Sequence, residues 1–378
     1  MNRLALNRRE AAMAEERKTD IIIRADGNAR IGAGHLMRCL TIAEEIRHKE
    51  RVVFWCADQA SAELAESRGY SVRVLGTDYR DMLSELPRWE AWAQQEQEKP
   101  ESLRPTILVD SYYVNAEYLQ ALRAYGRVCL LDDMGKQAWP VDGVINYNTF
   151  AQRESYERLY AGQDRLAGET ALYIGPAYVP LRSQFIGRKY QVQEQVKEIL
   201  ITTGGGDLEN IAGQILERIV NMKCRIHVIS GPYHPHGAWL EEYALRHPHV
   251  TVHRQVTEMA ALMEQCDLAI TAGGTTVYEL CALGVPFICF SYAENQEALA
   301  EYAGQQRIGR NAGKYHREPE KVLAHMAELV RETMADETGR REMSRKARAL
   351  VDGGGARRLA EVLETGLIAG ADGTYIVG

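Results

Sequence analysis

A histidine that directly follows a glycine-rich segment is the first group in this sequence that could do chemistry. The segment reads RADGNARIGAGH from Arg24 to His35, with an apolar run before it and an amphipathic run after it. We therefore expect a strand, a glycine-rich turn and a helix, in which backbone N–H groups and the helix N-terminus attract an anion. An imidazole at such a turn can act as a general base or acid. The alternative is a tight turn in which His35 serves only as a helix cap.

Carboxylates near this turn and at later strand ends could join the histidine. Asp26 lies within the segment, Asp110 follows an apolar run, and Asp132 and Asp133 follow another. A covalent intermediate would need one of these carboxylates as its nucleophile, whereas each could instead cap a turn or the following helix. Arg38, one helical turn after the histidine, could contact a phosphate or pair with a carboxylate.

Three turns in the second half of the chain combine glycine, hydroxyl and amide groups after apolar runs. They are Thr203–Asp207, Ala272–Thr276 and Ser291–Gln296. The Gly-Gly-Thr-Thr sequence in the second turn can present backbone N–H groups and two hydroxyls to a diphosphate. Glu279 lies one helical turn further on, where its carboxylate could accept hydrogen bonds from ribose hydroxyls. These features together favour a nucleotide site over simple chain reversal. The sequence contains no G-x-x-x-x-G-K-[ST] pattern, so a P-loop is not expected.

The elements that would position these residues alternate along the chain. In the first half, strands are expected at 21–24, 51–56, 71–75, 106–109, 128–131 and 144–146, with helices at 36–47, 61–68, 81–97 and 117–124. In the second half, strands are expected at 198–202, 225–229, 250–253, 268–271 and 286–290, with helices at 210–219, 238–246, 259–266, 276–283, 297–305, 319–332, 338–351 and 356–367. Continuous apolar strands predict parallel sheets covered on both faces, and their alternation with helices predicts an α/β fold.

Two Rossmann-like domains, with parallel sheets facing a central cleft, are the simplest architecture for this pattern. We expect an N-terminal extension over 1–20, a first domain over 21–190 that holds the histidine, and a second domain over 191–378 that binds a nucleotide. The alternation pauses between Phe150 and Gln195, which fits a domain connection. In such sheets ligands bind at the carboxyl ends of the strands, where the glycine-rich turns lie.

Composition excludes several classes of function. The net charge of −7 argues against a nucleic-acid partner. Seven scattered cysteines without a C-x-x-C pair indicate free thiols in a cytoplasmic protein. No segment reads as a signal peptide or a membrane span. His234 and His236 flank a proline, which predicts a surface loop rather than a metal site. We expect no metal, no cofactor and no membrane partner, and a monomer or weak homo-oligomer.

Six segments resemble those of the PseG/SpsG-type UDP-2,4-diacetamido-2,4,6-trideoxy-β-L-altropyranose hydrolases of pseudaminic acid biosynthesis, in the MurG-like GT-B superfamily. They are RADGNARIGAGHLMRCLTIA (24–43), VDSYYV (109–114), LDDMG (131–135), VINYN (144–148), TTGGGDLENI (202–211) and TAGGTTVYELCALGVPFICFSYAENQ (271–296). The resemblance implies metal-independent hydrolysis of a UDP-sugar. It also implies that water attacks the anomeric carbon and that UDP and the free sugar are released. Direct attack by water would invert the configuration at that carbon.

The resemblance also implies roles for single residues. His35 matches the catalytic histidine, and Tyr112 matches a tyrosine that follows an aspartate at a strand end. Glu279 matches the carboxylate expected on the uridine ribose, and Val256 lies in a loop whose backbone reads the uracil edge. The first eighteen residues have no recognised counterpart, and the spore-coat branch of the family is similar in pattern, which leaves the exact sugar open.

Together these observations predict a catalytic set and a substrate-binding set. The catalytic set is His35, Tyr112 and Asp26. The substrate-binding set includes the pair near the sugar and phosphates, Asn295 and Gln296, and comprises Gly34, Arg38, Asp110, Asp133, Gly205, Gly206, Val256, Gly273, Gly274, Thr275, Thr276, Glu279, Asn295 and Gln296. The competing hypotheses are a GT-B glycosyltransferase with the same UDP-sugar donor and a non-catalytic nucleotide-sugar binder.

Overall fold

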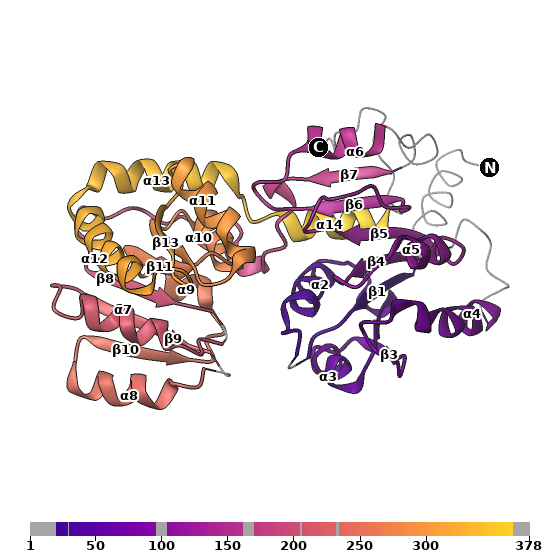
Figure 1. The fold of residues 1–378 in the computed structure, drawn as a ribbon, viewed down its shortest axis with the longest axis horizontal. Helices are drawn as coiled ribbons and strands as arrows, with labels where there is room; N and C mark the ends of the chain where they lie inside the picture. Colours follow the sequence, from indigo (N-terminus) through magenta and orange to yellow (C-terminus); the bar gives the residue numbers. More distant parts are fainter. Residues whose placement is uncertain are drawn as a thin grey trace, which may run out of the picture. The chain divides into compact units, whose positions relative to one another are not determined.

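The chain forms two compact units (Figure 1). The computed structural model describes residues 20–28, 30–95, 104–161, 170–204, 206–231 and 234–365. The first unit takes the chain up to Pro180 together with the segment from Gly355, and the second is Leu181–Gly354. The α/β class predicted from the sequence is confirmed.

The domain boundaries differ from those expected at 190 and at the end of the chain. The division falls at Pro180, and the helix α14 (Gly355–Glu364) belongs to the first unit rather than the second. One face of α14 is apolar, and it packs against the first helix and a central strand of the first unit. Gly355 permits this contact, because a Cβ atom there would lie 2.2 Å from the carbonyl oxygen of Val179.

The sheet of the first unit is parallel throughout its described strands. These are β1 (Ile21–Ala25), β2 (Val52–Cys56), β3 (Ser71–Val74), β4 (Thr106–Asp110), β5 (Arg127–Leu131), β6 (Gly143–Asn146) and β7 (Ala171–Ile174), in the order β3-β2-β1-β4-β5-β6-β7. The strand order reverses at β1 and β4, which are direct neighbours with Ala25 opposite Asp110. A ligand site is expected at the carboxyl ends of these two strands.

Helices accompany the strands of the first unit. They are α2 (Gly34–Glu44), α3 (Gln59–Ser67), α4 (Leu86–Gln95), α5 (Ala116–Leu122) and α6 (Arg153–Ala161), with 3₁₀ turns η1 (Lys49–Arg51), η2 (Met82–Glu85) and η4 (Pro176–Tyr178). Side chains of α4, α5 and α6 share one apolar cluster with Ile22 of β1 and with Ile107 and Val109 of β4. Helix α2 buries Leu36, Cys39, Leu40 and Ala43, the spacing of a single helix face. His35 and Arg38 lie on the same helix outside that buried set.

The second unit repeats this topology with fewer strands. Its described strands are β8 (Glu198–Thr202), β9 (Arg225–Ser230), β10 (Val250–Arg254), β11 (Leu268–Ala272), β12 (Phe287–Ser291) and β13 (Arg310–Lys314), in the parallel order β10-β9-β8-β11-β12-β13. Here the order reverses at β8 and β11, which pair directly with Thr202 opposite Thr271. The two glycine-rich turns that follow these strands therefore start at neighbouring positions.

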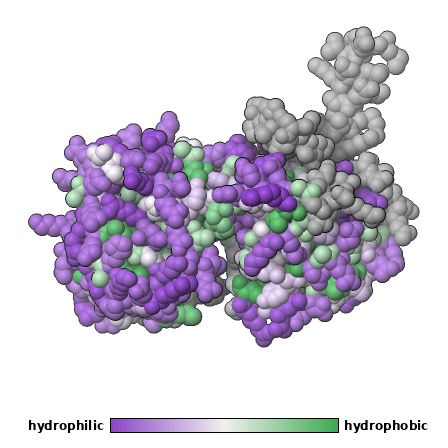
Figure 2. Space-filling view, turned by 45° about the horizontal axis from the view of Figure 1, so that its top comes forward, coloured by the Kyte–Doolittle hydropathy of each residue, from purple (hydrophilic) through white to green (hydrophobic). Residues whose placement is uncertain are grey.

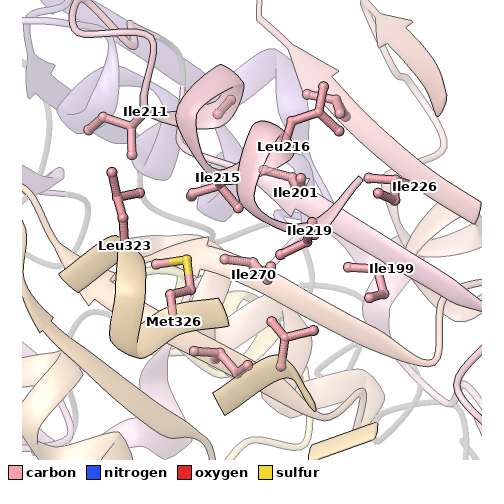
Figure 3. Close-up of a cluster of buried hydrophobic side chains, with 14 of the residues drawn as sticks. Ile199, Ile201, Ile211, Ile215, Leu216, Ile219, Ile226, Ile270, Leu323 and Met326 are labelled. Carbon is pink, nitrogen blue, oxygen red and sulfur yellow. The ribbon is translucent and has the colours of Figure 1, made fainter. Parts of the chain in front are cut away.

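Helices and an isoleucine-rich core support this second sheet. The helices are α7 (Ile211–Ile219), α8 (Gly237–Arg246), α9 (Met259–Glu264), α10 (Thr275–Leu283), α11 (Glu297–Gln305), α12 (Pro319–Ala335) and α13 (Glu337–Leu350), with 3₁₀ turns η5 (Ser183–Phe185) and η6 (Glu294–Gln296). Figure 3 shows Ile215 and Ile219 of α7 and Met326 of α12 gathered around strand residues such as Ile270. This packing fixes the start of α7 beside the carboxyl end of β8.

Three elements were not predicted from the sequence. Helix α6 and strand β7 lie inside the stretch expected to be a connection, and β13 follows α11. The α6 sequence RESYERLYA carries a helical signal, since Tyr156 and Tyr160 are buried one turn apart. Strand β13 reads RNAGK and has no apolar pattern, because it is an edge strand that only one neighbour covers.

The visible surface is mainly hydrophilic, with apolar residues scattered over it (Figure 2). Among the described residues, no helix has the length and apolar character needed to cross a bilayer. The seven cysteines are all free, and six of them are buried.

Candidate active site

The predicted catalytic histidine lies at the reversal point of the first sheet. Residues 26–33 connect β1 to α2, and His35 is the second residue of that helix. Asp110 is the last residue of the neighbouring strand β4. The fold thus brings together a turn residue and a strand-end residue that are 75 positions apart in the sequence.

His35 and Asp110 form a close pair. The imidazole Nδ1 lies 2.6 Å from Asp110 Oδ1, and the Asp110 side chain is fully buried. Burial alone would raise the pKa of Asp110, but the ion pair with Arg38 holds it well below its ordinary value. An ionised Asp110 accepts the Nδ1 proton of His35, so the ring presents Nε2 as its free, basic nitrogen. Asp110 is thus a positioning residue for His35.

Arg38 is engaged by carboxylates from two strand ends. It donates to both oxygens of Asp110 at 2.5 Å, to Asp133 at 2.9 and 3.0 Å, and to the Tyr147 hydroxyl at 2.8 Å. The sequence left open whether Arg38 contacts a phosphate or pairs with a carboxylate, and in the structure it pairs with carboxylates. The guanidinium links β4 to the turn after β5 and holds Asp110 in place.

Tyr112 stands beside the histidine with much of its ring open to solvent. Its ring packs edge-on against His35 at 4.5 Å between centroids, and its hydroxyl donates to Asp133 at 3.0 Å. Burial of the hydroxyl and the nearby Asp133 charge raise the pKa of Tyr112, so it stays protonated at neutral pH. With 60% of the residue exposed, Tyr112 can contact a ligand next to His35.

Asp26, the third predicted catalytic residue, is held by its own neighbours. Arg24 donates to Asp26 Oδ2 at 2.6 Å, and the backbone N–H of Ala57 donates to Oδ1 at 2.7 Å. Arg24 is itself buried and also pairs with Glu85. Both carboxylate oxygens of Asp26 are therefore already hydrogen bonded.

A pocket of about 250 Å³ opens at this point of the first unit. Its lining residues are Asp26, Arg30, Ile31, His35, Tyr79, Asp110, Ser111, Tyr112 and Tyr113. Sites for whole small ligands usually measure about 300–1,000 Å³, so this pocket suits one part of a larger ligand. Sequence reasoning missed five of these lining residues, Arg30, Ile31, Tyr79, Ser111 and Tyr113, and Tyr79 comes from a loop with no motif of its own.

The start of α10 is an open helix N-terminus in the second unit. Gly274 is its N-cap, and among the described residues no side chain caps it. Thr275 is exposed and Thr276 partly exposed. Gly273 lies against η6, since a Cβ atom there would be 2.8 Å from the carbonyl oxygen of Gln296. The first N–H groups of α10 are thus available to an anion.

The remaining nucleotide-side candidates surround this turn or lie on neighbouring loops of the second unit. Glu279 pairs with Arg182 at 3.1 Å, and burial raises its pKa while Arg182 opposes that shift. The loop that holds Val256 is braced by Gln184, which donates to the Thr257 carbonyl and accepts from the N–H of Ala260. In η6, the Gln296 side chain accepts from the N–H of Tyr292, and Asn295 is exposed.

The turn after β8 is arranged differently from the turn after β11. Gly205 lies outside the described residues, and Gly206 is exposed. Asp207 accepts from the N–H groups of Ile211 and Ala212 at 2.7 and 2.8 Å, so the start of α7 is already capped. The N-terminus of α10 is therefore more accessible to an anion than the N-terminus of α7.

The surface-loop expectation for the two histidines is wrong for His234. Its side chain is fully buried, with Nε2 3.5 Å from Oδ2 of Asp207, the last residue of the glycine-rich turn. His236 binds the Leu208 carbonyl at 2.9 Å from the same loop. Among the described residues no group of histidine, cysteine and carboxylate side chains could hold a metal ion.

Comparison with known proteins finds a family model that matches part of the chain, within the second unit. Residues 189–353 match the glycosyltransferase family 28 C-terminal domain. The matched residues include α10, Glu279, the Val256 loop and η6, that is, all the described nucleotide-side candidates.

Whole-chain relatives extend the match into the first unit. The chain is 26% identical over 349 residues to the spore coat polysaccharide biosynthesis protein SpsG of Bacillus subtilis (strain 168), covering 90% of this chain and 96% of that protein. It is 24% identical over 288 residues to the UDP-2,4-diacetamido-2,4,6-trideoxy-beta-L-altropyranose hydrolase of Campylobacter jejuni subsp. jejuni serotype O:2, covering 76% and 96%. The relatives of this chain therefore include a protein named as a UDP-sugar hydrolase.

Solved structures show the same fold. The crystal structure of Acinetobacter baumannii MurG matches with a TM-score of 0.65 at 12% identity, over 92% of this chain and 99% of that one. The fold is GT-B, as the resemblance implied.

Proposed function

We propose that this protein hydrolyses a UDP-linked sugar, with UDP-2,4-diacetamido-2,4,6-trideoxy-β-L-altropyranose as its substrate. The observation that carries the proposal is the His35–Asp110 pair, both of whose residues line a pocket of about 250 Å³. A homologue named for this hydrolysis and a family 28 domain with an open helix N-terminus support it. The coarser conclusion, an enzyme that processes a UDP-sugar, rests on both units.

In this mechanism His35 prepares the nucleophile. Its Nε2 accepts a proton from water as the water oxygen bonds to the anomeric carbon, and the bond from that carbon to the UDP oxygen breaks. Asp110 keeps Nδ1 protonated and stabilises the imidazolium that forms. UDP leaves as an anion, and the N–H groups of Thr275 and Thr276 meet its charge with the dipole of α10. We propose that these groups act without a metal ion.

The engagement of the carboxylates favours direct attack by water and hence inversion. Asp26 is held by Arg24 and Ala57, and Asp110 by Arg38 and His35. Asp133 accepts from Arg38 and Tyr112, and Asp132 accepts from backbone N–H groups and the Tyr156 hydroxyl. A retaining enzyme would need a carboxylate nucleophile close to the anomeric carbon. Each of the four candidates is already committed to partners of its own.

The test is product analysis in ¹⁸O-labelled water. We expect purified protein to release UDP and the free sugar of inverted configuration, with ¹⁸O in the sugar and none in UDP. The variant His35→Ala should lose activity by about 10²–10⁴-fold, the usual contribution of a general base. The control is His48→Ala, which removes a surface histidine of the same unit that pairs with Glu50.

Four outcomes would contradict the proposal. Label in the UDP would show attack at phosphorus, and retained configuration would require a covalent intermediate. An intact UDP-sugar in the presence of demonstrable UDP binding would favour a glycosyltransferase that lacks its acceptor, or a different sugar. Equal activity of His35→Ala and His48→Ala would remove His35 from the mechanism.

A further inference from the structure

The pocket in the first unit has an aromatic and aliphatic side that the proposed chemistry does not use. Ile31 comes from the glycine-rich segment, Tyr79 from the loop after β3, and Tyr113 from the turn after β4. The rings of Tyr79 and Tyr113 meet edge to face with centroids 5.6 Å apart. This contact joins two loops into one wall, which offers a ligand apolar surface at a fixed position.

Arg30 lines the same pocket and has donors to spare. Within the described part of the chain, neither an ion pair nor a hydrogen bond engages its guanidinium. The nearby Arg80, by contrast, is tied to Asp78, with its Nε at 3.0 and 3.2 Å and its terminal nitrogen at 2.7 Å. The acceptors of Asp78 are thereby occupied. The five N–H donors of Arg30 remain available to a ligand.

The carboxylates that line the pocket have partners other than Arg30. Asp26 and Asp110 each have both oxygens hydrogen bonded. A ligand that fits this side must therefore bring an acceptor for Arg30 and an apolar group for Ile31 and the tyrosine rings. An acetamido group has both, a carbonyl oxygen and a methyl group on one planar unit. A hydroxyl would supply only the acceptor.

We propose that this side of the pocket is a subsite for an acetamido substituent of the sugar, formed by Arg30, Ile31, Tyr79 and Tyr113. The inference rests on the proposed function and adds the residues that select the sugar. Arg30 donates to the acetamido carbonyl oxygen, and the methyl group packs against the aromatic wall. Arg30 is a specificity residue, since it touches a substituent and not the bond that breaks.

The test compares binding of UDP-sugars that differ only in their acetamido groups. The probes carry an acetamido group at C2, at C4, at both, or at neither, and UDP alone reports nucleotide binding. Affinity is measured by calorimetry, and saturation-transfer NMR reports contact with the acetamido methyl group. The proteins are the wild type, Arg30→Ala, Tyr79→Ala and the control Arg68→Ala, a surface arginine of the same unit that pairs with Glu44.

We expect the wild type to prefer at least one acetamido probe over the probe without one. Arg30→Ala should reduce that preference about tenfold, the value of one hydrogen bond to a charged group, while affinity for UDP and for the plain probe is unchanged. Tyr79→Ala should weaken the methyl saturation signal. Arg68→Ala should match the wild type in every measurement.

The outcomes separate this inference from the proposed function. Equal weakening of all probes in Arg30→Ala, or no weakening of any, would overturn the subsite. If the wild type releases no UDP from any sugar but keeps an Arg30-dependent acetamido preference, hydrolysis fails and the subsite stands. If hydrolysis proceeds and Arg30→Ala is as selective as the wild type, the subsite fails and hydrolysis stands.

Discussion

The imidazole of His35 and the carboxylate of Asp110 meet at 2.6 Å where neighbouring strands β1 and β4 end. Because Asp110 fixes which ring nitrogen carries the proton, the variant Asp110→Asn should lower kcat about 10²–10⁴-fold with little change in UDP affinity. Single-turnover kinetics and calorimetry with UDP measure the two quantities. The matched control is Asp142→Asn, which breaks a pair with Arg123 outside the pocket.

A different result for Asp110→Asn would change the interpretation of the pair. If kcat and UDP affinity fall together, the side chain supports the structure of the whole unit and not the orientation of His35. Circular dichroism of both variants separates these cases, because a folded protein with low kcat retains the spectrum of the wild type.

Arg38 joins two carboxylates that would otherwise repel each other, and its replacement should cost stability. Lysine can satisfy one of Asp110 and Asp133 but lacks the planar fork that reaches both. We expect Arg38→Lys to lower the free energy of unfolding by about 3 kcal/mol, the range for a broken, mostly buried ion pair. Urea denaturation measures it. The surface variant Arg68→Lys should change stability by less than about 1 kcal/mol, and an equally small effect of Arg38→Lys would contradict the structural role.

The sequence was sufficient for the fold class, for the positions of most elements, and for the turns that carry the candidate residues. It could not show that His35, Arg38 and Asp110 form one cluster, because that depends on β1 and β4 being neighbours. The place of α14 in the first unit was hidden for the same reason, since its apolar face does not say which sheet covers it. The burial of His234 was not predicted, because its only signal, a neighbouring proline, says nothing about the nearby carboxylate of Asp207.

The pKa of Glu279 links recognition to stability. Burial raises this pKa, so the folded state favours the protonated form, against the pull of Arg182. A carboxyl group whose pKa is raised on folding contributes stability below its ordinary pKa and loses it as pH rises through the folded value. The ionised Glu279 therefore costs stability at neutral pH. The melting temperature of Glu279→Gln should therefore rise relative to that of the wild type as the pH increases from 4 to 7.

The same variant should bind UDP less well. If Glu279 accepts hydrogen bonds from the ribose, replacing its charge should weaken UDP binding about tenfold or more. Thermal unfolding with and without UDP at each pH measures both effects. Parallel melting curves for the two proteins across this pH range would contradict the assignment, as would unchanged stabilisation by UDP.

Two adjacent glycines at the start of α10 allow a test of the diphosphate site that separates packing from binding. A Cβ atom at Gly273 would lie 2.8 Å from the Gln296 carbonyl oxygen, whereas one at Gly274 would meet nothing within 4 Å. Gly274 also has a φ of −110°, which any residue can adopt. Gly273→Ala should therefore destabilise the second unit by about 1–3 kcal/mol through overpacking against η6.

Gly274→Ala should keep the stability of the wild type and still lose UDP affinity. The added methyl group would stand in the open space next to the N–H groups that we propose for the diphosphate, so an anion could no longer approach them closely. Chemical denaturation gives the stability, and calorimetry with UDP and with uridine gives the binding. A loss for UDP that uridine does not share places the effect at the phosphates. Equal UDP affinity in Gly274→Ala and the wild type would show that the diphosphate does not bind at the start of α10. Another part of the second unit would then have to bind it.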